Sequence, residues 1–195
     1  MDIRVLLSGI ATIIAVVSFV PYIRSMLRGK TKPHAFSWLI WSVVAYIAGA
    51  GQLAAGGGVG AVAVLVTAAI CTWVTIHAFR NRAVTVTKGD RISLAVALAA
   101  IPIWVVTKDP LPAVMLVTII DLLAFWMTMR KTYHQPHSEN LTQYTMSIAK
   151  YALIILAVEQ YNLTTLFYPV VQEVATIIFC VMVVTRRQQV ALPPV

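Results

Sequence analysis

Long uninterrupted apolar runs dominate this sequence, and they constrain its fold more than any other feature. The 195 residues are 59% hydrophobic and only 11% charged, with a mean hydropathy of +0.83. A helix that crosses a bilayer needs about 20 apolar residues, whereas a barrel strand alternates apolar and polar residues over about 10. Because the runs here are continuous, the sequence predicts an all-α integral membrane protein in contact with the lipid bilayer.

Charged residues and Gly or Pro breaks divide the apolar sequence into seven runs. The predicted transmembrane helices cover residues 5–27, 35–55, 59–79, 92–107, 111–129, 141–160 and 163–185. The fourth run is the shortest, and it contains Pro102, which removes a backbone donor. We therefore expect this segment to be a kinked linker helix.

Lys and Arg residues collect in alternate connections between these runs. They are Arg24, Arg28, Lys30 and Lys32 after the first run, Arg80, Arg82, Lys88 and Arg91 after the third, Arg130 and Lys131 after the fifth, and Arg186 and Arg187 after the seventh. Basic loops stay in the cytoplasm, so the N-terminus is expected outside and the C-terminus inside, in a bacterial inner (plasma) membrane. This topology explains the net charge of +8, and no nucleic-acid partner is expected.

The dipeptide Pro-His occurs after two of these basic connections, at Pro33–His34 and Pro136–His137, 103 positions apart. The same offset carries the first three runs onto the last three and leaves the fourth over. The sequence thus predicts a three-helix repeat at 1–82, a linker helix at 83–108, a second repeat at 109–187 and a cytoplasmic tail at 188–195. An odd linker gives both repeats the same orientation, a parallel 3+1+3 arrangement. The two histidines are interpreted as interfacial capping residues, with proton handling as the alternative.

The stretch "FVPYIRSMLRGKTKPHAFSWLIW" carries a family resemblance. Its proline and aromatic residue near the end of the first run, its basic loop and its Ser-x-x-x-aromatic re-entry resemble the PQ-loop repeat of the SWEET and related MtN3-type transporters. Pro21–Tyr22 stands where that family has Pro-Gln, and the second repeat has Ala124–Phe125. The resemblance implies alternating-access movement of a small polar molecule, commonly a sugar, through a pocket between the repeats. It also implies a hinge at Pro21, for which a static kink is the alternative.

Three ionisable residues fall near the middle of the last three runs: Asp121, Lys150 and Glu173. A charge at the bilayer centre is costly, by about 2.5 to 3.5 kcal/mol on insertion scales, and such residues face protein or water. Asp121 and Lys150 are expected either to line the pocket or to form a fixed ion pair between their helices. Glu173 has no obvious structural partner and is the strongest functional candidate.

Polar residues at helical spacing extend this site along each run. The substrate-binding candidates are Glu173, Asp121, Lys150, Gln172, Thr176 and Ser147 in the second repeat and Trp73 in the first. The 103-residue offset places Ser18, Ile47 and Ile70 opposite the three charged residues, while Trp73 and His77 replace Thr176 and Cys180. Tyr22, Phe125 and His77 are the candidate gate or proton-handling residues.

No Gly-rich phosphate loop, metal-ligand spacing or credible Ser-His-acid set occurs in the sequence, so we expect neither an enzyme nor a cofactor or bound metal. The predicted function is a membrane transporter for a sugar or similar small polar metabolite. A proton-coupled amino-acid or vitamin carrier and a non-transporting membrane receptor remain alternatives. The small-molecule substrate, protons and a second copy of the chain are the candidate partners besides lipid.

Overall fold

The computed structural model describes residues 2–28, 35–80, 88–134, 136 and 141–190, and these residues form helices joined by short connections, with no strand among them. The helices are α1 Ile3–Leu27, α2 Ala35–Ala54, the short 3-10 helix η1 Gly58–Ala61, α3 Val62–Arg80, α4 Lys88–Thr107, α5 Pro110–His134, α6 Leu141–Ala157 and α7 Leu163–Gln189. The predicted all-α class is confirmed. His34 and His137 lie outside the described residues.

Local sequence explains where several of these helices begin and end. The Asp2 side chain accepts a hydrogen bond from the Arg4 N–H and caps α1. Asn162 and Thr165 form a reciprocal capping box at the start of α7. Gly56 and Gly58 have φ angles of +81° and +55°, which a side chain disfavours, so glycine allows the chain to turn after α2.

Four helical segments are long and apolar enough to cross a membrane, judged by length and composition: Ile3–Arg24, Ala35–Ala54, Gly58–Arg80 and Leu163–Gln189. Leu94–Thr107 and Pro110–Leu123 are shorter apolar segments. Large apolar side chains are also exposed on the outer faces of several helices, among them Ile13, Val106, Leu123 and Val181. Apolar surface of this extent is typical of a protein that lies in lipid rather than in water.

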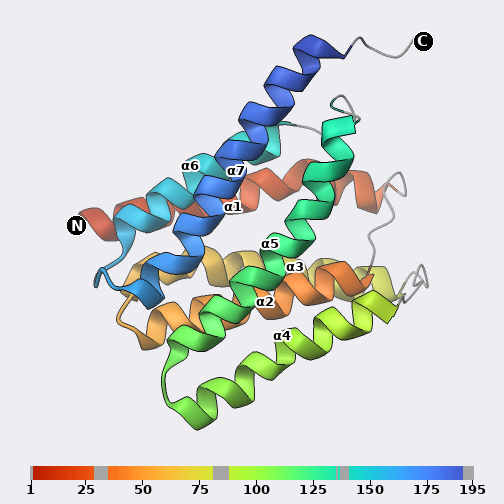
Figure 1. Cartoon of the computed structure of the whole chain (residues 1–195). Helices are drawn as coiled ribbons and strands as arrows, with labels where there is room; N and C mark the ends of the chain where they lie inside the picture. The colour runs from red at the N-terminus through yellow and green to blue at the C-terminus, as the bar shows by residue number, and fades with distance from the viewer. Residues whose placement is uncertain (1, 29–34, 81–87, 135, 137–140, 191–195) are drawn as a thin grey trace.

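Consecutive helices run in alternating directions, so the C-terminal ends of α1, α3, α5 and α7 lie on one side of the bundle (Figure 1). We call this side the basic end, because it contains Arg24, Arg80, Arg186 and Arg187. The opposite side is the glycine end, where residues 55–61 and 158–162 connect α2 to α3 and α6 to α7.

The neighbour relations of the helices are the same in the two halves of the chain. In the first half α3 packs against both α1 and α2, and in the second half α7 packs against both α5 and α6. Between the halves, α1 packs on α6 just as α5 packs on α2. Exchanging α1–α3 with α5–α7 therefore preserves these six pairings. Helix α4 packs against α5 and α2 at one edge of the bundle (Figure 1).

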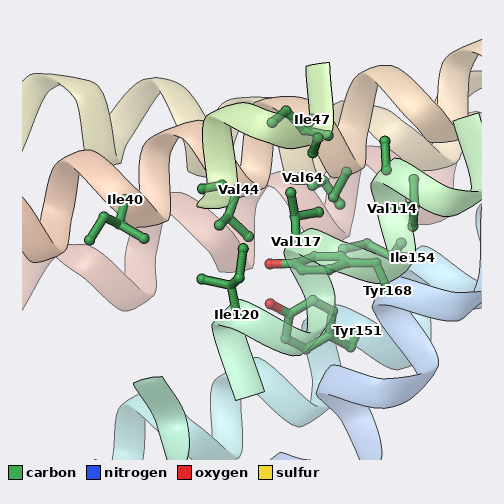
Figure 2. Packing of buried hydrophobic residues seen from close by; sticks show 14 of the residues in the cluster. Ile40, Val44, Ile47, Val64, Val114, Val117, Ile120, Tyr151, Ile154 and Tyr168 are labelled. Atoms are coloured by element: carbon green, nitrogen blue, oxygen red, sulfur yellow. The ribbon is translucent and has the colours of Figure 1, made fainter. Parts of the chain in front are cut away.

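The largest apolar core joins the two halves. It contains Ile40, Val44 and Ile47 of α2, Val114, Val117 and Ile120 of α5, and Tyr151, Ile154 and Tyr168 of α6 and α7. Figure 2 shows the two tyrosine rings beside the aliphatic side chains, with their hydroxyl oxygens pointing in the same direction. This close packing places two polar groups in an otherwise apolar layer, next to the charged residues of the second half.

Candidate functional site

Asp121, in the middle of α5, is held by side chains of α7. Gln172 Nε2 donates a hydrogen bond to Asp121 Oδ2, and the Tyr168 hydroxyl lies 3.5 Å from the same oxygen. Tyr168 and Gln172 are both buried and stand one helical turn apart, so they present their donors on one face of α7. A carboxylate in an apolar layer thus receives two polar contacts from a single neighbouring helix.

Lys150 is almost fully buried on α6, with 5% of its surface exposed. Its Nζ lies 4.2 Å from the centre of the Tyr151 ring, and Asp121 is the opposite charge nearby. Within the described chain, no hydrogen-bond acceptor contacts the ammonium group. A buried cation without an acceptor is rare in proteins, because desolvation of the charge is not compensated.

Of the two alternatives for Asp121 and Lys150, the fixed ion pair is not formed: the described residues show no direct contact between the two charges. The reason is the order of the helices. Helix α7 packs against both α5 and α6 and therefore lies between them, and its side chains take the contacts of the carboxylate. The two charges share one layer of the bundle but remain separate.

Tyr151 and Tyr168 complete this group of side chains, which we call the charged layer: Asp121, Lys150, Tyr151, Tyr168 and Gln172. The tyrosine ring centroids are 6.3 Å apart with an interplanar angle of 76°. Tyr168 was not predicted as a site residue, because it lies in an apolar run. It could have been predicted from its spacing, because Tyr168, Gln172 and Thr176 are four residues apart and therefore lie on one face of the helix.

The other polar candidates of the second half lie beside this layer. Thr176 is buried, and its hydroxyl donates to the Gln172 carbonyl at 2.7 Å, whereas the Ser147 hydroxyl donates to the Gln143 carbonyl at 2.9 Å. Both hydroxyls are therefore satisfied within their own helices. Glu173 is partly buried, and its Oε2 atom is enclosed without a hydrogen-bond partner in the described part of the chain.

The structure does not bring Trp73 and His77 into the charged layer. Trp73 is 44% exposed on the outer face of α3, where its ring stacks on His77 with centroids 5.9 Å apart. Trp73, a predicted substrate-binding residue, therefore lies outside the group of side chains around Asp121. At the other aligned positions, Ile47 is buried in the core, and the buried Ser18 hydroxyl bonds to the Ala15 carbonyl of its own helix.

Two aromatic groups lie toward the basic end. In the first half, Trp38 Nε1 donates to the Tyr22 hydroxyl at 3.1 Å, and the Trp38 ring also meets Trp41 at 5.3 Å between centroids. In the second half, the Phe125 and Tyr144 rings lie 5.3 and 4.4 Å from the Phe179 ring. Tyr22 and Trp41 are the equivalents of Phe125 and Tyr144 at the offset of 103 residues.

Pro21 immediately precedes the first of these aromatic groups and lies inside the continuous helix α1. A proline in a helix interior leaves one carbonyl without its usual partner and permits bending. Pro21 is thus located where α1 would have to bend if Tyr22 were to separate from Trp38.

Hydrogen bonds between the two halves close the glycine end. Glu159 N donates to the Gly57 carbonyl at 3.3 Å and Gln160 N to the Gly56 carbonyl at 3.1 Å. Asn162 Nδ2 donates to the Ala55 carbonyl at 2.8 Å. Deeper in the bundle, the fully buried Gln52 donates to the Thr165 carbonyl at 3.2 Å, while its Oε1 has no partner among the described residues. The two halves are thus joined directly above the charged layer.

No protein-family model, curated protein or solved structure matches this chain.

Proposed function

We propose that this protein is a membrane carrier that moves a small polar metabolite by alternating access. The observation that supports this most strongly is the charged layer. It lies inside an apolar bundle and includes a buried cation that has no acceptor among the residues that the structure describes. Ionisable groups at such a depth are expensive to retain, and they typically mark the path of a solute or ion.

The arrangement of the helices supports the 3+1+3 scheme for this carrier. All seven helices would cross the bilayer, with 1–82 and 109–187 as parallel repeats and 83–108 as the linker. The matched pairings of α1–α3 and α5–α7 are those expected of two repeats related by an axis along the membrane normal. With its basic end in the cytoplasm, the N-terminus would lie outside a bacterial inner membrane. The resemblance to SWEET and PQ-loop transporters is consistent with the same scheme.

The contacts at the two ends indicate how access would alternate. The glycine end is closed by hydrogen bonds between the halves, so a solute would reach the charged layer from the basic end, once the aromatic contacts there separate. There, separation of Tyr22 from Trp38, and of Phe125 from Tyr144, would open the path, with Pro21 as the hinge of α1. The opposite conformation would require the bonds of the glycine end to break.

Proton coupling is a second candidate property of this carrier, and Glu173 favours it. One of its carboxylate oxygens is enclosed without a partner, an arrangement that suits the protonated, neutral carboxyl better than the carboxylate. A group that changes its protonation with conformation can couple transport to a proton gradient.

Counterflow in proteoliposomes tests the carrier. Labelled sugars, amino acids and vitamins are offered to wild type, to Asp121→Asn and to Thr145→Ala, with and without a pH gradient. Thr145 is a matched control, because its exposed hydroxyl bonds to its own helix. We expect wild type and Thr145→Ala to exchange at least one solute and Asp121→Asn to lose that exchange. Equal flux in Asp121→Asn would refute the role of the charged layer, and no flux of any solute in wild type would favour a receptor.

A further inference from the structure

The two charged residues of the charged layer, Asp121 and Lys150, do not use all of their hydrogen-bonding atoms. Lys150 Nζ has no acceptor in the part of the chain that the structure describes. Asp121 accepts both of its described hydrogen bonds at Oδ2, so Oδ1 is unused. Buried charges in proteins are normally paired, and here an unpaired cation and a half-used carboxylate face the same layer.

Neither atom is completely enclosed. The buried side-chain atoms that are fully enclosed without a partner are Gln52 Oε1 and Glu173 Oε2, among the described residues. Lys150 Nζ and Asp121 Oδ1 do not belong to this set, although neither has a hydrogen-bond partner in the described part of the chain. Because Lys150 is only 5% exposed, a solute would reach these donors and this acceptor in a more open conformation of the bundle.

The two charges are opposite, separate and coupled. They interact electrostatically but do not touch, because α7 lies between α5 and α6. A simple anion would pair with Lys150 and repel Asp121, and a simple cation would do the reverse. A neutral polyol would supply hydrogen bonds but leave both charges without a counter-ion. A molecule that carries one ammonium and one carboxylate satisfies both groups at once.

We propose that the charged layer binds a small zwitterion of the α-amino-acid class, with its ammonium on Asp121 and its carboxylate on Lys150. The inference rests on the proposed carrier function and specifies its substrate class. Tyr151 and Tyr168 flank the site and add two hydroxyl groups. Helix α6, which carries Lys150, packs on α1 of the first half, so a bound solute would lie close to both halves.

Thermal unfolding of the purified protein in detergent tests binding without requiring transport. The probes are a mixture of neutral L-amino acids, glucose, propionate and isopropylamine, each at the same concentration. We expect the amino acids to raise the midpoint temperature, because a ligand that binds only the folded state stabilises it. Glucose and the two singly charged probes should leave it unchanged. Stabilisation by glucose, with none by amino acids, would overturn the inference.

Counterflow with the same probes separates this inference from the carrier proposal. Exchange of glucose but not of amino acids would refute the zwitterion site while the carrier stands. Stabilisation by amino acids without any flux would refute the carrier while the site stands.

Two variants assign the charges. Lys150→Met should weaken amino-acid binding by about tenfold or more, because it removes the partner of the solute carboxylate. Lys150→Arg keeps the charge and should retain part of the binding. If the lysine had only a structural role, the Met and Arg variants would bind amino acids equally well. Asp121→Asn should weaken binding similarly if it folds. Unchanged amino-acid binding in a folded Lys150→Met variant would contradict the assignment.

Discussion

The two halves of this bundle share one pattern of helix packing but have different interiors. In α1–α3 the buried side chains are mainly apolar or aromatic, including Phe19, Trp38 and Val74. In α5–α7 the corresponding depth contains Asp121, Lys150 and their polar partners. The first half shows that this packing does not require charges. The charges of the second half are therefore better explained by function than by folding, and exchanging residues between equivalent positions is the direct test.

Replacing Asp121 with Ser, its equivalent in the first half at position 18, should have the largest effect. Gln172 and Tyr168 would lose their acceptor, and Lys150 would lose the nearby negative charge. Removing one member of a buried set of charges costs about 3 kcal/mol or more of unfolding free energy. Denaturant titration of the purified protein in mild detergent measures this loss. A stability equal to that of wild type would show that the two halves tolerate the same residues at this depth.

Replacing Lys150 with Ile, the residue at the equivalent position 47, should act in the opposite direction. The ammonium is buried without an acceptor among the described residues, and Ile47 is already part of the apolar core. Losing the desolvation cost of this ammonium should stabilise the protein by about 1 to 2 kcal/mol, because Asp121 keeps its contacts from Gln172 and Tyr168 and depends little on the lysine. We expect a more stable protein in the same titration, and Lys150→Arg, which keeps the charge, should show no gain. A loss of stability in Lys150→Ile would reveal a structural partner of the lysine.

Gly58→Ala should have the smallest effect of the three. The offset of 103 residues pairs the glycine turn Gly56–Gly58 with residues 159–161, and these equivalent turns meet at the glycine end. An added Cβ at Gly58 would collide with the Glu159 carboxylate, which accepts from the Val59 N–H at 3.1 Å, and φ would stay at an unfavourable +55°. A loss of about 1 kcal/mol is expected.

Gly9→Ala is the matched control for this third prediction, because nothing lies within 4 Å of an added Cβ there. Alanine in a helix interior should leave the unfolding free energy unchanged or raise it slightly. The double variant Gly58→Ala/Glu159→Ala should recover part of the loss. If the double variant recovers no stability, the whole loss in Gly58→Ala comes from the unfavourable φ angle at residue 58.

Much of the fold could be predicted from the sequence, because long apolar runs and their breaks are local features. The segments expected at residues 35–55 and 92–107 correspond to α2 and α4 within a few residues. The predicted sixth helix is too long: α6 ends at Ala157 instead of Gln160. Glu159 and Gln160 instead bond to the glycine turn of the other half, a contact that no local pattern reveals.

The candidate site could be predicted only in part, for a related reason. Helical spacing correctly placed Gln172 on an inward face, and it drew attention to Asp121 and Lys150 as buried charges. It did not reveal that α7 separates α5 from α6, so it left the ion pair open as an alternative. Trp73 was misplaced because an offset between repeats gives equivalent positions but does not determine which face of α3 lies inside.

The hydrogen bonds between the halves at the glycine end determine which mutations this region tolerates. Its bonds from Glu159 to Gly57 and from Gln160 to Gly56 use only main-chain atoms, so they do not depend on which side chains the second half has there. Most substitutions at residues 159 and 160 would leave the donors in place. Proline, which lacks the N–H group, would remove one, and an insertion or deletion in either turn would shift the register of both. These two main-chain bonds between the halves thus depend on the lengths of the turns rather than on the side chains at residues 159 and 160.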